Sequence, residues 1–257
     1  MFFTGEIRGD NSSWLLLREN LIEANNADVI FDLWTGEPEK EALLKIIFRP
    51  CAWFTEPYDA AYVERVQANE PRFKFIDGNL YAIGKGETIH VVDSFYRTHH
   101  AMNKSRWDLT EGSVLVRARL DQYFGFPVKI PLEIPQGALY LPSLSLHSQP
   151  SCPMNANDLF AFGDYAAMSI YFDVFPHMFD ILAAMKKNPG YTEWWNKTDL
   201  ERPQEGKFRC DSEGFLGWHL RMNNVSCLFA PQLGRQGTYN NTLVRKVNDA
   251  WLPQIID

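Results

Sequence analysis

The sequence has no cluster of basic residues and no long apolar run. Its 257 residues carry a formal net charge of -7, and no Lys/Arg-rich stretch occurs among them. Nucleic-acid-binding domains neutralise phosphates with a basic surface, so the composition argues against a nucleic-acid partner. No run of about 18 apolar residues is present, and the chain opens directly on a strand-like segment. We therefore expect neither a transmembrane segment nor a signal peptide.

Cysteine is scarce and scattered. The four cysteines, Cys51, Cys152, Cys210 and Cys227, form no Cys-x-x-Cys pair. This spacing argues against a zinc ribbon and against a dense disulfide framework, and it favours a reducing compartment. Together with the expected absence of a signal peptide, it predicts a cytoplasmic protein.

Internal repeats and low-complexity tracts are also missing, whereas apolar residues make up 46% of the chain. A chain of this size and composition can bury a sizeable core. We therefore predict a single domain that spans residues 1–257.

Strand and helix patterns alternate along the first third of the chain. An apolar segment broken by Gly5 precedes a helical pattern over residues 12–25, with Ser12 or Ser13 as its N-cap. The apolar run at 27–34 predicts a buried parallel strand, and residues 38–48 predict a helix with Pro38 in its first turn. This alternation predicts an α/β fold with a mostly parallel central sheet flanked by helices.

The later segments are more varied. Residues 72–92 alternate around Asp77-Gly78 and around a second turn at 84–86, which predicts β-hairpins outside the sheet. We expect a helix at 94–103, one long or two consecutive helices over 163–188 with an interruption near Pro176, a short helix at 213–224, and a last strand at 225–231.

The segment "SVLVRARLDQYFGFPVKI", residues 113–130, has the pattern of a buried strand that carries charges. Arg117, Arg119 and Asp121 have a spacing of two, so on a strand they would share one face. Charges on a buried strand are costly unless they meet a ligand, a metal or one another. The three residues therefore form either a structural ion network or a diphosphate site at the carboxyl end of the strand. In such a site Asp121 would bind a divalent metal, and the arginines would donate to phosphate oxygens.

Five segments, "TGEIRG", "ADVIFDLWTG", "VRARLDQYF", "NDLFAFGDYAAMSIY" and "EGFLGWHLRMNNV", follow one another in an order and spacing that resemble GT-A-type glycosyltransferases of surface-polysaccharide clusters. The resemblance covers nearly the whole chain and implies a GT-A-like, Rossmann-like fold. It implies a nucleotide-sugar donor, with a UDP-sugar favoured, and a glycan acceptor. It also implies Mn²⁺ or Mg²⁺ as a cofactor on Asp121. Arg119 stands where a DxD element has its first acidic residue, so this carboxylate would hold the metal without a second one.

The resemblance also assigns roles to individual residues. Donor-binding roles fall on Thr4, Gly5 and Arg8 in the loop after the first strand, and on Arg117, Arg119 and His219. Each assignment has a plainer alternative. Arg8 could be a solvated loop residue. Asp158 could deprotonate the acceptor hydroxyl or be an ordinary acid at a helix N-terminus. Glu213 could contact donor sugar hydroxyls, act as the base instead, or cap its helix.

The leading hypothesis is a hexosyl- or pentosyltransferase that moves a sugar from a nucleoside-diphosphate sugar to a glycan hydroxyl. One alternative is a carbohydrate hydrolase that uses Asp158 and Glu213. The other is a catalytically silent glycan-binding domain, which the incomplete DxD element motivates. A hydrolase needs no nucleotide loop, so binding of a nucleoside diphosphate separates the hypotheses. The sequence leaves the oligomeric state open.

Overall fold

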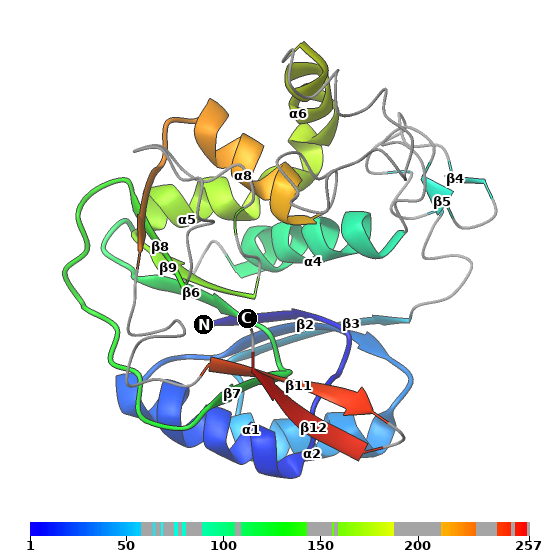
Figure 1. Ribbon diagram of the computed structural model, residues 1–257. Helices are drawn as coiled ribbons and strands as arrows, with labels where there is room; N and C mark the ends of the chain where they lie inside the picture. The colour runs from blue at the N-terminus through cyan, green and yellow to red at the C-terminus, as the bar shows by residue number, and fades with distance from the viewer. Residues whose placement is uncertain are drawn as a thin grey trace.

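A seven-stranded mixed sheet forms the centre of the molecule (Figure 1). The computed structural model describes residues 1–57, 64, 68, 75–76, 79–80, 89–105, 109–142, 156, 159–187, 212–229, 241–247 and 250–255. The strands of the sheet, in spatial order, are β10 (Ser226–Phe229), β8 (Ala138–Leu141), β9 (Phe160–Gly163), β6 (Leu115–Ala118), β1 (Phe2–Gly5), β2 (Ile30–Thr35) and β3 (Ala52–Pro57).

Most neighbouring strands of this sheet are parallel. β1 pairs in parallel with both β2 and β6, β2 with β3, and β8 with β10. Only β9 runs antiparallel to its neighbours, β6 and β8. The predicted α/β fold with a mostly parallel central sheet is confirmed, and so is the parallel strand expected within residues 27–34.

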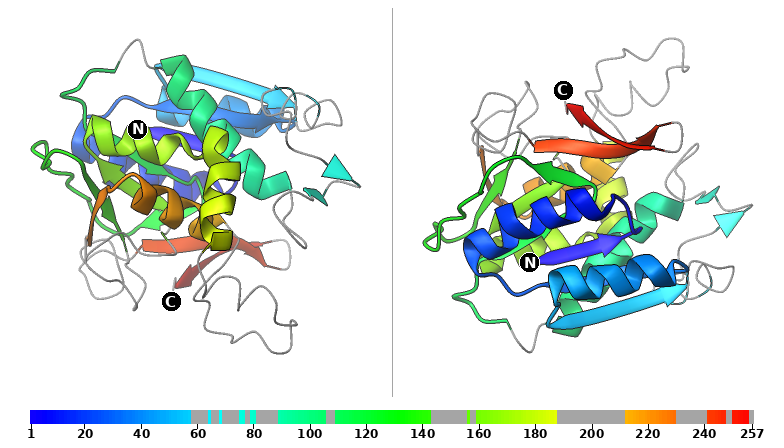
Figure 2. Two further views of the ribbon diagram at one scale, coloured as in Figure 1. Left: turned by 90° about the horizontal axis from the view of Figure 1, so that it is seen from above. Right: turned by 90° about the horizontal axis from the view of Figure 1, so that it is seen from below.

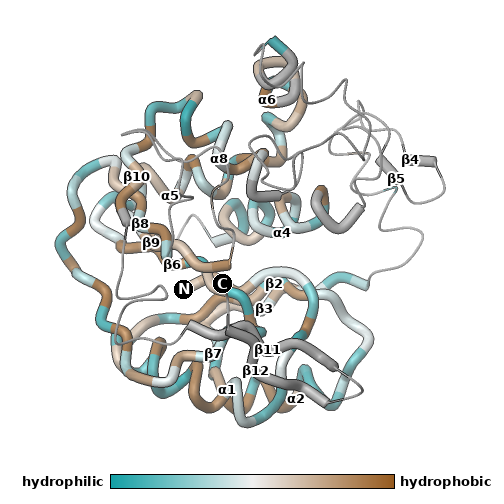
Figure 3. Tube along the Cα trace, viewed as in Figure 1, coloured by the Kyte–Doolittle hydropathy of each residue, from teal (hydrophilic) through white to brown (hydrophobic). Residues whose placement is uncertain are grey.

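Helices cover both faces of the sheet, as the views from above and below show (Figure 2). One face carries α1 (Asn11–Leu17), its π-helical continuation η1 (Arg18–Glu23) and α2 (Pro38–Phe48). The other carries α4 (Ile89–Ser105), α5 (Tyr165–Phe172), α6 (Val174–Lys187) and α8 (Ser212–Met222). Hydrophobic stretches run along the strands between these two layers (Figure 3).

The period of two along each strand produces two separate cores. Phe2 and Ile30 are buried in the core beneath α4, α5, α6 and α8. Their neighbours Phe3 and Phe31 are buried in the core beneath α1 and α2. Because both faces of the sheet are covered, β1 and β2 are apolar on both sides, which is typical of strands in buried parallel sheets.

Helix starts follow local sequence, with one correction. Pro38 occupies the first turn of α2, as predicted. The N-cap of the first helix is Asp10 and not Ser12 or Ser13. The Asp10 side chain accepts from the Ser13 backbone, and the Ser13 hydroxyl accepts from the Asp10 backbone N–H. This capping box satisfies two backbone donors at once, which a cap at either serine would not do.

Two of the later predictions also need correction. Residues 89–92 begin α4 and do not form a hairpin arm, whereas the hairpin of β4 (Phe75–Ile76) and β5 (Asn79–Leu80) is confirmed. The segment at 225–231 contains β10 but is not the last strand. β11 (Asn241–Val247) and β12 (Ala250–Ile255) follow it, and with β7 (Gln122–Phe124) they form a second, antiparallel sheet. The turn at 84–86 lies outside the described residues.

The long helical segment divides as predicted, with α5 ending at Phe172 and α6 beginning at Val174. Pro176 lies in the first turn of α6, where a missing N–H costs no helical hydrogen bond.

None of the described helices is long and apolar enough to span a membrane. Cys227 is disulfide-bonded to a partner outside the described residues, contrary to the expectation of reduced cysteines, and Cys51 is free.

Candidate functional site

The loops after β1 and β6 meet at one edge of the sheet. β1 and β6 are neighbours and run in parallel, with Phe2 opposite Arg117 and Phe3 opposite Ala118. Their carboxyl ends therefore lie at the same edge, and the residues that follow them are close in space. In open α/β sheets this edge is where ligands bind.

Three charged side chains from these two loops form what we call the Arg–Asp cluster: Arg8, Arg119 and Asp121. Arg119 donates from Nε to Oδ1 of Asp121 at 2.9 Å and from Nη2 to Oδ2 at 2.6 Å. Nη1 of Arg8 lies 3.6 Å from Oδ2 of the same carboxylate. The Asp121 side chain is 2% exposed, whereas those of Arg119 and Arg8 are 21% and 42% exposed. Two solvent-facing guanidinium groups are thus held on one buried carboxylate.

The predicted geometry of the charged strand is correct only in part. β6 ends at Ala118, so Arg117 lies on the strand while Arg119 and Asp121 lie in its connection to β7. The spacing of two therefore does not place all three on one strand face. Arg119 and Asp121 do pair, as the ion-network alternative predicted, but the second arginine beside Asp121 is Arg8 and not Arg117.

Arg117 and Gln122 are buried on either side of this connection, in β6 and β7. Among the described residues, Nη1 of Arg117 has no hydrogen-bond partner, and neither do the amide nitrogen and oxygen of Gln122. A buried polar group without a partner costs free energy. Both side chains are candidates for contact with a ligand, and Gln122 was not among the predicted site residues.

The loop after β1 is tightly organised. The Trp14 indole donates to the backbone oxygen of Arg8 at 2.8 Å, and Asp10 caps α1 directly after it. Gly9 has a φ of 91°, and a Cβ on it would lie 2.8 Å from the Trp14 indole nitrogen and 3.0 Å from the Leu120 backbone oxygen. Gly5, with a φ of 101°, has open space where a Cβ would be. Gly9 therefore packs this loop against the loop after β6, while the Gly5 backbone stays accessible.

The predicted contact residue Thr4 is turned toward α4. Its hydroxyl oxygen lies 3.3 Å from that of Thr98 on this helix. Thr4 thus belongs to the packing of β1 against α4, next to Gly5 at the end of the strand.

A buried ion network lies beside Thr4 and was missed by sequence reasoning. Arg97 of α4 donates from Nη1 to Asp32 of β2 at 2.8 Å and from Nε to Asp93 at 3.2 Å. His100 contacts the other oxygen of Asp32. Burial raises the pKa of Asp93 to about 7, although the charge of Arg97 acts in the opposite direction. Two signals were available: Asp32 in an otherwise apolar strand, and the i,i+4 pair of Asp93 and Arg97 in α4.

This network fixes α4 to the carboxyl ends of two strands. Arg97 also donates to the backbone oxygens of Leu33 in β2, at 3.2 Å, and of Glu56 in β3, at 3.4 Å. A buried, charged hydrogen-bond network is strongly directional. The edge on which the Arg–Asp cluster lies is therefore held rigidly on its α4 side.

His219 belongs to the helical layer above the sheet. It is buried in α8, and its ring stacks on His177 of α6 with centroids 5.3 Å apart. Burial, together with the nearby His177, lowers the pKa of His219 to about 4. None of its contacts in the described part of the chain is to Arg8, Arg119 or Asp121, so the structure does not join His219 to the cluster.

The two predicted catalytic acids are not described at the side-chain level. Asp158 lies outside the described residues. Glu213 follows the first residue of α8, and its side chain is likewise outside the description. Their roles remain predictions from the sequence.

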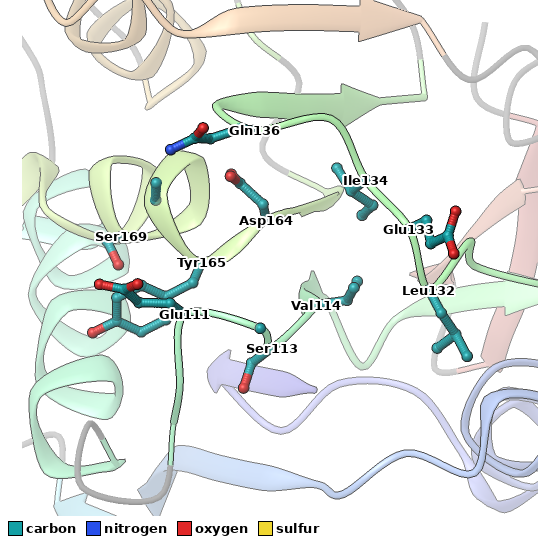
Figure 4. A pocket seen from close by; sticks show the side chains of 12 residues that line it. Glu111, Ser113, Val114, Leu132, Glu133, Ile134, Gln136, Asp164, Tyr165 and Ser169 are labelled. Atoms are coloured by element: carbon teal, nitrogen blue, oxygen red, sulfur yellow. The ribbon is translucent and has the colours of Figure 1, made fainter.

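A cavity of about 630 Å³ opens at the opposite edge of the sheet, near the amino end of β6 (Figure 4). Glu111, Tyr165 and Ser169 lie on one side of it, and Leu132 and Glu133 on the other. Its lining contains three carboxylates and no basic side chain: Glu111, Gly112, Ser113, Val114, Leu132, Glu133, Ile134, Gln136, Asp164, Tyr165, Ala166 and Ser169. Such a cavity would repel an anion, so it does not suit a diphosphate.

No family model and no curated protein matches the chain. Among solved structures, the chain is similar to mouse Xyloside xylosyltransferase 1 in its apo form, with a TM-score of 0.38 and 10% sequence identity. The similarity covers 89% of this chain and 84% of that one. A likeness this distant carries no argument about function, which has to rest on the residues of the site.

Proposed function

We propose that the chain is a nucleotide-sugar-dependent glycosyltransferase that transfers a hexosyl or pentosyl group to a glycan hydroxyl, with a UDP-sugar as the favoured donor. The observation that supports this most is the Arg–Asp cluster at the carboxyl edge of β1 and β6. Guanidinium groups bind phosphate oxygens in a forked geometry, so the cluster suits the diphosphate of a nucleotide. The open backbone at Gly5 lets such a ligand approach β1 closely.

The reaction would be a displacement at the anomeric carbon of the donor. The acceptor oxygen forms a bond to that carbon while the bond to the β-phosphate oxygen breaks, and the nucleoside diphosphate leaves with the electron pair. Arg8 and Arg119 would stabilise the charge that develops on the leaving group. If the reaction inverts the anomer, a carboxylate takes the hydroxyl proton. Asp158 is the proposed base, and Glu213 is the first substitute.

A divalent cation on Asp121 was expected from the sequence. Such a cation can bind only if the carboxylate oxygens of Asp121 are free. Both oxygens of this carboxylate already accept hydrogen bonds from Arg119. Among the described residues, no group of three His, Cys, Asp or Glu side chains could hold a metal ion. The described residues do not fit a divalent cation, and no step of the reaction is assigned to one.

A thermal-shift panel of UDP-, GDP-, dTDP- and CMP-sugars tests the proposal. A nucleotide at 100 times its Kd stabilises the folded state by roughly 2.7 kcal/mol. Arg8→Ala should weaken the shift. Arg18→Ala is the matched control, because Arg18 pairs with Glu23 at 2.7 Å much as Arg8 pairs with Glu6 at 2.7 Å, but on η1. If no nucleotide stabilises the protein while a glycan does, the hydrolase or the silent glycan-binding domain replaces this proposal.

A further inference from the structure

The Asp121 carboxylate is already fully used by arginine. Arg119 takes both oxygens, at 2.9 and 2.6 Å, and Arg8 approaches Oδ2 to 3.6 Å. Mg²⁺ and Mn²⁺ need several oxygen ligands in a fixed geometry. To bind Asp121, the cation would have to displace Arg119 and then remain next to its positive charge.

Glu6, a second carboxylate in contact with Arg8, is also engaged. Glu6 accepts from Nε of Arg8 at 2.8 Å and pairs with Nη2 of the same residue at 2.7 Å. A cation between Asp121 and Glu6 would therefore meet Arg8 as well as Arg119. The two carboxylates and the two guanidinium groups balance in charge, and both carboxylates are paired with arginine and not free to serve as metal ligands.

Arg117, near the carboxyl end of β6, adds a positive charge that no described carboxylate balances. It is buried in β6, two residues before Arg119, and its Nη1 finds no hydrogen-bond partner in the part of the chain that the structure describes. No ion pair joins Arg117 to any carboxylate in the described part of the chain. An uncompensated buried guanidinium is costly, and an anion close to it lowers that cost.

We propose that the Arg–Asp cluster, with Arg117 two residues before it on β6, binds the diphosphate of the nucleotide directly and without a divalent cation. This inference rests on the proposed function. Asp121 then acts as a positioning residue, because it holds the guanidinium groups of Arg119 and Arg8 where a metal ion was expected. The arginines supply the positive charge that the leaving diphosphate needs.

Isothermal titration of the full chain with inorganic diphosphate and with UDP tests this inference. Each titration is run in excess EDTA and again in excess Mg²⁺ or Mn²⁺. The Kd in EDTA should equal that in Mg²⁺ or Mn²⁺ within about threefold, or be lower. Arg8→Gln should weaken both ligands by about tenfold, and Arg18→Gln should leave both unchanged. Arg8 and Arg18 are partly exposed, so neither change removes core packing.

Tightening of tenfold or more by Mn²⁺ or Mg²⁺, removed by Asp121→Asn, would overturn the inference and leave the glycosyltransferase proposal standing. The two proposals can also separate in the other direction, with the cation-free site supported and the glycosyltransferase contradicted. Inorganic diphosphate that binds in EDTA through Arg8, without tighter binding of any nucleotide, would support the cation-free site and count against the glycosyltransferase. Failure of diphosphate and UDP to bind under either condition would overturn both.

Discussion

Arg119 donates two N–H groups to the two oxygens of Asp121, but only the arginine of this pair reaches solvent: its side chain is 21% exposed and that of Asp121 is 2% exposed. The two halves of the pair therefore should not respond equally to mutation. Loss of Arg119 leaves the buried carboxylate with only the Arg8 contact at 3.6 Å, whereas loss of the carboxylate charge leaves a guanidinium on a partly exposed side chain.

The first prediction uses this asymmetry. Arg119→Met should destabilise the protein by about 3 kcal/mol, because the buried Asp121 charge loses both hydrogen bonds from Arg119 and keeps only the Arg8 contact at 3.6 Å. Asp121→Asn should cost about 1 kcal/mol, since the amide keeps the shape of the carboxylate and the Arg119 side chain is already partly exposed. Urea unfolding of both variants and of Arg119→Met/Asp121→Leu measures the coupling. Equal losses in the two single variants would contradict the described exposure of the pair.

The second prediction compares the two glycines of the loop after β1. Gly5→Ala should cost roughly 1–2 kcal/mol, the penalty for a positive φ alone. Gly9→Ala should cost more, because its Cβ also meets the Trp14 indole nitrogen at 2.8 Å and the Leu120 backbone at 3.0 Å. Urea midpoints of the two variants give the comparison. A smaller loss for Gly9→Ala would mean that the loops after β1 and β6 are not packed as described.

The third prediction concerns His219 at acidic pH. Its pKa is about 4 in the folded state against 6.5 when unfolded, so the unfolded chain binds the proton first. Above pH 6.5 His219 is neutral in both states and the free energy of unfolding is not reduced. As the pH falls from 6.5 toward 4, the free energy of unfolding decreases by up to roughly 3 kcal/mol, because the unfolded chain takes up the proton. His219→Phe should flatten this part of the stability profile. An unchanged acid slope in His219→Phe would show that His219 is not held neutral by burial.

The fourth prediction concerns Asp93, which should reduce stability as the pH rises and not as it falls. The pKa of Asp93 is about 7 in the folded state against 3.8 when unfolded, so the folded state holds the proton longer. The contribution of Asp93 to the free energy of unfolding is complete below pH 3.8 and is lost as the pH rises toward 7. Asp93→Asn, which is neutral at every pH, should abolish this loss, whereas Asp180→Asn on the exposed face of α6 should not. Chemical unfolding across this pH range provides the test.

Periodicity predicted the sheet because burial on both faces leaves a strong signal. Residues 27–34 are apolar on both sides, and the matching strand is β2, between β1 and β3. The hairpin of β4 and β5 was predicted from the Asp77-Gly78 turn sequence, because a turn signal is local to a few residues. β11 and β12 were missed although they alternate, since β11 joins a sheet through β7, a strand of three residues more than a hundred positions away, and β12 pairs only with β11.

The site was predictable in composition but not in geometry. Spacing along one strand identified Arg119 and Asp121, yet the turn after Ala118 replaces the strand there, so the second arginine beside Asp121 is Arg8 from another loop. The Asp32–Arg97–Asp93 network joins a strand to a helix more than sixty residues away, which no local pattern encodes. Such contacts depend on the register of β1, β2 and α4, which only the fold determines.

Hydrogen–deuterium exchange of the full chain, with and without saturating UDP, tests the central claim that the carboxyl edge of β1 and β6 is the nucleotide site. The account predicts slower exchange of backbone amides in residues 5–10 and 119–122 when UDP is bound, in EDTA as well as with Mg²⁺, and no change around the cavity at 111–114 and 132–137. Protection of the cavity segments alone, with residues 5–10 and 119–122 unaffected, would contradict it.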